Sequence, residues 1–244
     1  MGDAAVQIRG MRKKSGSFVL DIERFDVFFG SVVGLVGENG AGKTTLLNIM
    51  AGRSRFDEGS LLFSDELKSA RGVSVACVFD RPDIDGLLCA WDIDAVFRNL
   101  YPDWSTDEFF SYIGGYGIDR DKRIEAMSRG MKTKTMLSIG LSHGARLLLL
   151  DEVTSGIDLY SRSDMLSTIR SYALEKNATV VLSSHIVSDL ELAADYCAVL
   201  SSGSFVLMDS MAAIRDASGS MSTEEYLVSL RNEGCFLVYE GIDN

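Results

Sequence analysis

The chain has 244 residues, of which 46% are hydrophobic, and it carries a formal net charge of −11 at pH 7. This length allows one large domain, or a core with a subdomain, and is enough to bury a sizeable core. The acidic balance argues against a general nucleic-acid binder, which would show a basic face, and against electrostatic adhesion to anionic lipid.

The N-terminus and the cysteines predict a cytosolic protein with reduced thiols. Residues 1–5 lack the basic start and apolar stretch of a signal peptide, and no apolar run approaches the roughly 18 residues of a membrane span. None of the four cysteines pairs at C-x-x-C spacing, so neither a zinc site nor a disulfide framework is indicated. We therefore expect no nucleic-acid partner and no direct membrane insertion.

Residues 6–36 predict strands that lead into a glycine-rich loop. Apolar and polar residues alternate over 18–27, which is typical of a half-exposed antiparallel strand. A turn signal at Gly30 precedes residues 32–36, a short apolar run that indicates a buried strand. Phe18 is a candidate for stacking on an adenine ring, and an ordinary strand aromatic packed in the core is the alternative.

Residues 37–44 match the phosphate-loop pattern G-x-x-x-x-G-K-[ST] at every fixed position. The buried strand before them and an expected helix over 45–51 give the strand–loop–helix context that the motif needs. Backbone N–H groups of such a loop surround phosphate oxygens, Lys43 can reach the β- and γ-phosphates, and the Thr44 hydroxyl can ligate Mg²⁺. The candidate phosphate-binding residues are Gly37, Glu38, Asn39, Gly40, Ala41, Gly42, Lys43, Thr44 and Thr45.

The middle of the chain changes from strand to helical spacing. A turn is indicated at 57–60, and strands at 61–63 and 73–79, before Pro82 breaks regular structure. From about 83 to 134 we expect a helical subdomain inserted into an α/β core. Its predicted apolar helix faces contain Ile93, Val96, Phe97 and Leu100, then Phe109, Phe110 and Ile113. Three further aromatics fit either a core or a partner-docking surface: Trp91, Tyr101 and Trp104.

An apolar run at 147–150 that ends in Asp151 and Glu152 is the second strong signal. It predicts a buried strand whose C-terminal end presents two carboxylates at the site. In a phosphate-loop enzyme the first acid orients Mg²⁺, and the second can accept a proton from the attacking water. The strand predicted at 178–185 ends in His185 at the same end of the sheet, and we assign that histidine a functional role. His143, on a polar loop, is expected to be an ordinary residue.

The remaining segments complete the core. Helices are expected around 136–141, 161–176 and 189–194, and strands at 196–200 and 205–208. The tail predicts a short helix near 223–230 and a strand at 236–239, neither of which carries recognisable chemistry.

Taken in order, these residues resemble the ATPase subunit of an ABC transporter over about 18–208. Residues 127–131, Met-Ser-Arg-Gly-Met, are similar to its signature motif, which is usually L-S-G-G-Q. The stretches at 101–104 and 128–132 look like those of bacterial ABC-2-type subunits. The other matching segments are 37–44 for the Walker A motif, 147–152 for Walker B, 155–158 for the D-loop and His185 for the switch histidine.

The resemblance implies a P-loop NTPase fold, with a RecA-like α/β core, an N-terminal antiparallel β-sheet and an inserted α-helical subdomain. Residues 1–79 and 136–220 would form the ATP-binding core. Residues 80–135 would form the helical subdomain that carries the signature motif, and 221–244 the C-terminal tail.

The resemblance also implies ATP and Mg²⁺ as cofactors and an active site shared between two ATPase subunits. They would close head-to-tail around two ATP molecules, and the second subunit could be another copy or a different protein. Glu152 would be the catalytic base, His185 the γ-phosphate sensor and Lys43 the phosphate-binding cation. Residues acting across the interface would be Ser128, Arg129, Gly130 and Asp158, and metal ligands would be Thr44, Asp80 and Asp151.

Closing on ATP and opening after hydrolysis would drive an integral membrane permease. The chain would then sit in the cytoplasm, peripheral on the inner face of the cell membrane. The cargo is not encoded here, because the membrane subunit normally selects it. The likeness to ABC-2-type subunits leans towards export but does not fix the direction of transport.

Two positions depart from the family pattern. Asp80 stands where the Q-loop usually has glutamine, and it is shorter by one methylene, negatively charged and an oxygen ligand that Mg²⁺ accepts. Arg129 replaces the first signature glycine and adds a cation near the γ-phosphate. We expect hydrolysis to be retained because the main catalytic set is present, namely Lys43, Asp151, Glu152 and His185.

Two other functions compete with transport. One is a soluble ABC-type ATPase in an assembly or repair complex; acidity and the lack of a long heptad stretch disfavour its DNA-repair version. The other is a regulatory subunit that binds nucleotide without hydrolysing it, a hypothesis that Asp80 and Arg129 motivate and that Glu152 and His185 oppose.

Overall fold

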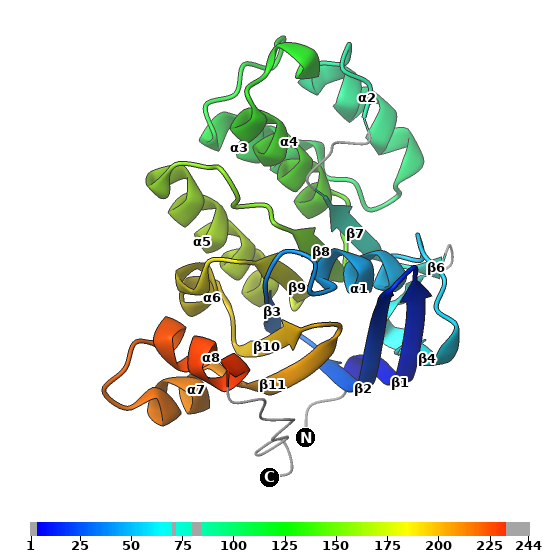
Figure 1. Cartoon of the computed structure of the whole chain (residues 1–244). Coiled ribbons are helices and arrows are strands. Elements are labelled where there is room, and N and C mark those ends of the chain that lie inside the picture. Colours follow the sequence, from blue (N-terminus) through cyan, green and yellow to red (C-terminus); the bar gives the residue numbers. More distant parts are fainter. Residues whose placement is uncertain (1–3, 70–71, 80–83, 233–244) are drawn as a thin grey trace.

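A computed structural model describes residues 4–69, 72–79 and 84–232 as an α/β protein with an antiparallel sheet on one side and a group of helices at one end (Figure 1). The expected fold class is therefore confirmed. Among the described residues, no helix combines the length and the hydropathy needed to cross a membrane.

The N-terminal sheet has the strand order β2-β1-β4 and is antiparallel throughout. Its strands are β1 (Ala4–Ser15), β2 (Phe18–Phe28) and β4 (Glu58–Phe63). The turn expected at 57–60 is wrong, because β4 already begins at Glu58. Gly59 has φ of 89°, and a Cβ on it would lie 2.2 Å from the carbonyl oxygen of Gly10. The glycine therefore permits close packing of β4 on β1 at an irregularity in their register, not a reversal of the chain.

The central sheet has the strand order β11-β10-β3-β9-β8-β7, with β10, β3, β9, β8 and β7 parallel and β11 antiparallel to β10. Every residue of β3, β8 and β9 is buried, as expected for a sheet covered on both faces. The strands are β3 (Val32–Val36), β7 (Val75–Val78), β8 (Leu147–Asp151), β9 (Thr179–Ser184), β10 (Tyr196–Ser201) and β11 (Ser204–Ser210).

The strand expected at 73–79 is divided at Ser74. Gly72 and Val73 form β6 (Gly72–Val73), which pairs with β5 (Lys68–Ser69), and the backbone N–H of Ser74 donates to the carbonyl of Leu67. A short 3-10 turn, η1 (Asp65–Leu67), precedes this hairpin. The local hairpin thus takes the first residues of the predicted strand away from the central sheet.

Two apolar layers cover the central sheet. Leu148 and Leu150 of β8 face one layer, while Leu147 and Leu149 face the layer shared with the antiparallel sheet. The helices around the core are α1 (Lys43–Met50), α5 (Leu159–Lys176), α6 (Val187–Ala193), α7 (Met211–Ser218) and α8 (Thr223–Asn232). The tail helix is confirmed as α8, whereas α7, which Ser210 caps, was not expected. The strand predicted at 236–239 lies outside the described residues.

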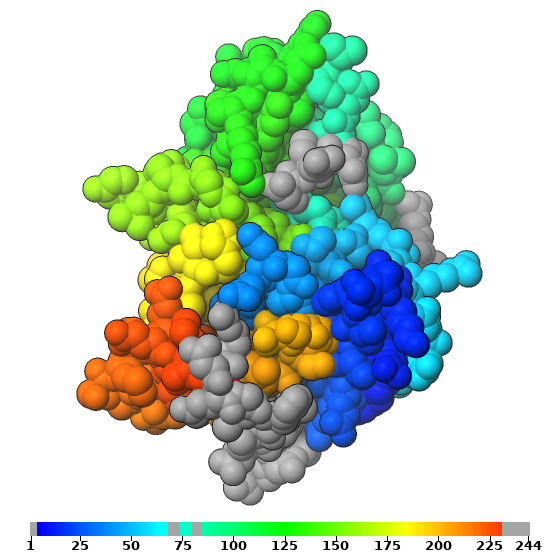
Figure 2. All heavy atoms as spheres, viewed as in Figure 1, coloured from blue at the N-terminus to red at the C-terminus, as the bar shows by residue number. Residues whose placement is uncertain are grey.

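Three helices and one 3-10 turn form the helical subdomain: α2 (Ala90–Leu100), α3 (Thr106–Gly115), η2 (Ile124–Ala126) and α4 (Arg129–Ser142). They share an apolar cluster of their own, and in Figure 2 the green residues of α3 and α4 lie at the top, away from the blue antiparallel sheet. The subdomain boundary proposed between residues 135 and 136 falls within α4, which is continuous, and the division stays a prediction.

The inner face of α2 differs from the predicted one. Ile93 is buried, but Val96 and Leu100 are 43% and 56% exposed. The helix instead buries Asp94, whose Oδ1 accepts hydrogen bonds from Trp104 Nε1 at 2.8 Å and from the Thr106 hydroxyl at 2.6 Å. A polar anchor between α2 and the start of α3 therefore turns the helix away from its most apolar orientation.

Tyr172 provides a test of the core between α5 and the strand β8. Its ring is buried, its hydroxyl donates to the carbonyl of Ala145 at 2.8 Å, and burial raises its pKa. We expect Tyr172→Phe to lower the free energy of unfolding by about 1 kcal/mol, because one buried hydrogen bond is lost. Urea unfolding measures this, with Tyr160→Phe, 85% exposed, as the matched control. An equal effect in both variants would contradict the assignment.

Candidate functional site

The phosphate loop connects the end of β3 to α1 in a conformation that depends on its glycines. Gly40 and Gly42 have φ of 85° and 114°, and the N–H of Ala41 donates to the carbonyl of Glu38 at 3.1 Å. A Cβ on Gly37 would lie 2.3 Å from the carbonyl oxygen of Leu200, so this glycine allows the loop to pack on β10. The loop opens on a cavity of about 410 Å³ lined by Phe18, Glu38, Asn39, Gly40, Gly42, Lys43, Thr44, Thr45 and Glu152.

Phe18 lies at the rim of this cavity and also belongs to the loop's packing. A Cβ on Gly42 would be 3.0 Å from its Cζ atom. The position of Phe18 therefore fits both interpretations, a ring that stacks on a ligand and an aromatic residue packed in a strand. Its contact with adenine stays a prediction.

Lys43 is held in the centre of the loop and is 6% exposed. Its Nζ atom donates to the carbonyl of Gly37 at 2.6 Å and to that of Glu38 at 3.3 Å, and it lies 3.3 Å from Oε1 of Glu152. A buried ammonium surrounded by oxygen acceptors is electrostatically suited to bind phosphate oxygens at the same point.

Asp151 joins the loop to the end of β8. Its Oδ2 accepts from the Thr44 hydroxyl at 2.7 Å, and its Oδ1 accepts from the Ser183 hydroxyl at 2.6 Å. The paired oxygens of Thr44 and Asp151 are hard ligands of the kind that Mg²⁺ binds. Within the described residues no three His, Cys, Asp or Glu side chains cluster as a complete metal site, so phosphate oxygens and water would supply the other ligands. Asp80 lies outside the described residues.

Glu152 lies between Lys43 and His185. Its Oε2 is 2.5 Å from Nδ1 of His185, while its Oε1 faces Lys43. Glu152 has φ of 51°, a left-handed backbone conformation that turns the chain sharply after β8. The backbone turn thus places one carboxylate in contact with both the loop cation and the histidine. His185 is half-exposed and follows β9 directly.

Ser183 is a supporting residue that the sequence analysis missed. Besides donating to Asp151, its hydroxyl accepts from the backbone N–H of Glu152 at 3.0 Å, so it fixes the last residue of β8 and the residue after it from the neighbouring strand. The two adjacent serines before His185 were its only sequence signal, since nothing local shows that one of them faces Asp151.

Ser128 and Asp158 lie at the starts of two helices, outside the lining of the cavity at the phosphate loop. Ser128 caps α4 by accepting from the N–H of Met131 at 3.3 Å, and Asp158 caps α5 by accepting from the N–H of Ser161 at 3.0 Å. The hydrogen bonds from Ser161 lower the pKa of Asp158. A Cβ on Gly156 would lie 3.5 Å from Nη1 of Arg129, so the start of α4 contacts the loop before Asp158.

Neither cap is part of the cavity at the phosphate loop. The described residues that line it include none of Ser128, Arg129, Gly130 and Asp158. The chain therefore assembles Lys43, Thr44, Asp151, Glu152 and His185 at one end of its central sheet, and leaves these four outside that group.

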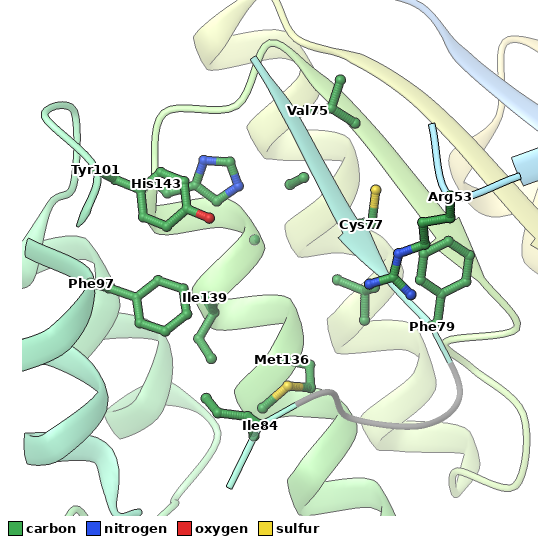
Figure 3. Close-up of a pocket in the computed structure, with 13 residues that line it drawn as sticks. Arg53, Val75, Cys77, Phe79, Ile84, Phe97, Tyr101, Met136, Ile139 and His143 are labelled. Carbon is green, nitrogen blue, oxygen red and sulfur yellow. The ribbon is translucent and has the colours of Figure 1, made fainter. Parts of the chain in front are cut away.

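A second cavity, of about 320 Å³, lies between α2, α4 and β7 (Figure 3). Phe97, Tyr101 and His143 lie on one side of it, and Phe79 and Arg53 on the other. Tyr101 stacks on His143 with 4.8 Å between the ring centroids, and burial lowers the pKa of His143. His143 is therefore a packed loop residue next to the cavity, at a distance from the phosphate loop.

A sequence model of the family described as ABC transporter matches residues 20–155. The lantibiotic transport ATP-binding protein SrtF of Streptococcus pyogenes is 28% identical over 224 residues, which are 90% of this chain and 94% of SrtF.

Solved structures agree in fold. One described as the ATP-binding subunit of an ABC transporter superposes with a TM-score of 0.76 at 21% identity, covering 93% of this chain and 99% of that one. A dimeric post-hydrolysis state of the ATP-binding cassette MJ0796, bound to ADP and Pi, gives 0.70 at 18% identity, covering 84% of this chain and 98% of that one.

Ser183→Ala tests the support of Asp151 and Glu152. We expect the variant to bind ATP about tenfold more weakly in excess Mg²⁺, because a residue that orients a metal ligand is lost. Affinity measured in EDTA should change little. Titration with a fluorescent ATP analogue measures both values, and Ser142→Ala, another fully buried serine that bonds within its own helix, is the control. Equal affinity for wild type and Ser183→Ala in Mg²⁺ would contradict this role.

Proposed function

Because this chain belongs to the ABC transporter family and is an ATP-binding ATPase of that family, we propose that its ATP hydrolysis energises transport through a separate membrane permease. The observation that carries the proposal is the position of Glu152, in contact with both Lys43 of the phosphate loop and His185. In this position the Glu152 carboxylate lies next to the site of the phosphate and can accept a proton from a water molecule there.

The proposed reaction is phosphoryl transfer from ATP to water. The water oxygen forms a bond to the γ-phosphorus, the bond from phosphorus to the β–γ bridging oxygen breaks, and ADP leaves. Glu152 takes the proton of the attacking water, and His185 orients the γ-phosphate. Lys43 and the N–H groups at the start of α1 stabilise the negative charge that accumulates on the phosphate oxygens.

Mg²⁺ is proposed as a cofactor because Thr44 and Asp151 present converging oxygen ligands next to the loop. The ion would neutralise charge on the β- and γ-phosphate oxygens. Ser183 would hold Asp151 in position for it. The part of Asp80 in this site stays a proposal from sequence alone.

A second ATPase subunit is the next proposed partner. Gly130 lies in the first turn of α4, and among the described residues outside that turn no atom lies within 4 Å of a Cβ built on it. Packing within the described part of the chain thus gives no reason for a glycine there, whereas close approach of a nucleotide held by another subunit would. We propose that Ser128, Arg129, Gly130 and Asp158 act across this interface. The dimeric state described for MJ0796 supports a second subunit.

The permease is proposed to bind at the cavity of Figure 3. Its lining combines apolar side chains with the polar groups of Arg53, Tyr101 and His143. Val96 and Leu100 of α2 are exposed large apolar residues. Binding there would put the subunit on the cytoplasmic face of the membrane without insertion of its own. The name of SrtF, a lantibiotic transport protein, supports transport over the soluble assembly or repair function.

Glu152→Gln tests the catalytic assignment. Glutamine keeps the size of the side chain but cannot accept the proton, so we expect kcat for ATP hydrolysis to fall by about 100-fold or more while ATP binding is retained. Phosphate release measures hydrolysis, and Glu175→Gln, an exposed residue of α5, is the control. Hydrolysis by Glu152→Gln at the wild-type rate would show that another group is the base.

The transport assignment is tested by capture of the permease. Tagged Glu152→Gln protein holds ATP without hydrolysing it, so its closed state persists. With Mg·ATP and detergent-solubilised native membranes, we expect mass spectrometry to identify a polytopic membrane protein. This membrane protein should not be captured when the tagged bait is instead Lys43→Ala, which lacks the phosphate-binding cation. Capture of soluble partners alone would favour the assembly ATPase.

A further inference from the structure

Asp189 of α6 is a fully buried carboxylate that the proposed chemistry does not use. Its Oδ2 accepts a hydrogen bond from the Thr154 hydroxyl at 2.5 Å and another from the Ser184 hydroxyl at 3.2 Å. Its Oδ1 lies 3.0 Å from Nε of Arg162, which is 19% exposed. One side chain therefore connects three segments: the turn after Glu152, the first turn of α5 and the end of β9.

Two of these segments carry catalytic residues. Thr154 lies two residues after Glu152, inside a turn in which the N–H of Ser155 donates to the carbonyl of Glu152 at 3.0 Å. Ser184 precedes His185, and its hydroxyl also accepts from the N–H of Ile186 at 3.0 Å. The carboxylate of Asp189 thus bonds directly to the turn after Glu152, and through Ser184 it holds the backbone on both sides of His185.

The third segment is the first turn of α5. Arg162 lies one turn after Asp158, and its backbone N–H donates to the carbonyl of Asp158 at 2.9 Å. Helices α5 and α6 pack side by side (Figure 1), which brings Arg162 to Asp189. The loop that contains the D-loop residues is therefore held at both ends, at Thr154 and at Arg162.

Because Asp189 is buried, all of its hydrogen-bond and charge partners must stay in place together. A carboxylate removed from water is strongly destabilising unless several donors and an opposite charge compensate for the lost hydration. Thr154, Ser184 and Arg162 supply that compensation, and Thr154 and Ser184 are themselves buried. Displacing one loop would leave a buried charge short of a partner, so the two catalytic loops are fixed relative to each other.

We propose that Asp189 is a positioning residue, which holds Glu152 and His185 in contact at the phosphate loop through Thr154 and Ser184. The proposal rests on the proposed ATPase function for its kinetic effect but not for its structural effect. Asp189 itself does not line the cavity at the phosphate loop.

Thr154→Val and Thr154→Ser form the matched test. Valine keeps the shape of threonine and removes the hydroxyl, whereas serine keeps the hydroxyl. We expect kcat for ATP hydrolysis to fall about 10- to 100-fold in Thr154→Val, with KM for ATP changed less than about threefold. Thr154→Ser should recover most of kcat, and Asp189→Asn, which keeps the size of the side chain, should lose it as Thr154→Val does.

A second readout does not depend on hydrolysis. The chain contains two histidines, so ¹⁵N-labelled imidazole spectra give one set of signals for His185 and one for His143. We expect Thr154→Val to move the Nδ1 signal of His185, because its contact with Glu152 at 2.5 Å is loosened. The signals of His143, which lies outside the site, should stay in place, and Glu152→Gln identifies the signal that reports the contact.

Three results would overturn the proposal. An unchanged His185 signal in both Thr154→Val and Asp189→Asn would show that the network does not position the pair. A kcat loss without a His185 shift would assign the effect to general destabilisation, which thermal unfolding of each variant measures. Equal losses of kcat in Thr154→Ser and Thr154→Val would show that the methyl group of Thr154 matters through its packing and that its hydroxyl does not. Absence of hydrolysis in wild type would overturn the ATPase function instead, while the His185 signal still decides the role of Asp189.

Discussion

The register of three buried parallel strands is the constraint on which the site depends. Val36 at the end of β3 is paired with Ser184 of β9, and Ser183 is paired with Asp151 of β8. The phosphate loop, the acids and the histidine therefore leave the sheet at the same level, although about 140 residues separate Lys43 from His185 in the sequence. A shift by one residue would turn Asp151 to the opposite face and away from Thr44.

Hydrogen bonds from hydroxyl groups fix the carboxylates that this register brings together. Thr44 and Ser183 occupy the two oxygens of Asp151, and Thr154 and Ser184 share one oxygen of Asp189. Each carboxylate is buried, so its hydrogen bonds are formed in surroundings of low dielectric and are costly to break. Both groups are connected to the Glu152–His185 pair: the Ser183 hydroxyl accepts from the backbone N–H of Glu152, and the Ser184 hydroxyl accepts from that of Ile186, next to His185.

The helical subdomain is held together separately from the central sheet. It has its own apolar cluster, and its first helix is anchored through Asp94 instead of presenting its most apolar face inward. This orientation of α2 leaves Val96 and Leu100 exposed on the helix that also lines the cavity next to β7. Two parts of the chain thus differ: the ends of the central strands hold the groups for phosphate chemistry, and the helical subdomain exposes the apolar residues at which we propose that another subunit binds.

The sequence by itself determined the elements whose cause is local. The phosphate loop, the buried strand ending in Asp151 and Glu152, and His185 after the next strand follow from glycine spacing and runs of apolar residues. Only the tertiary structure decided what depends on distant neighbours. Gly59 permits close strand packing because Gly10 lies against it, and Asp189 and Ser183 support the site because β8, β9 and α6 meet. The physical reason is that a buried polar group is defined by its partners, and these come from other parts of the chain.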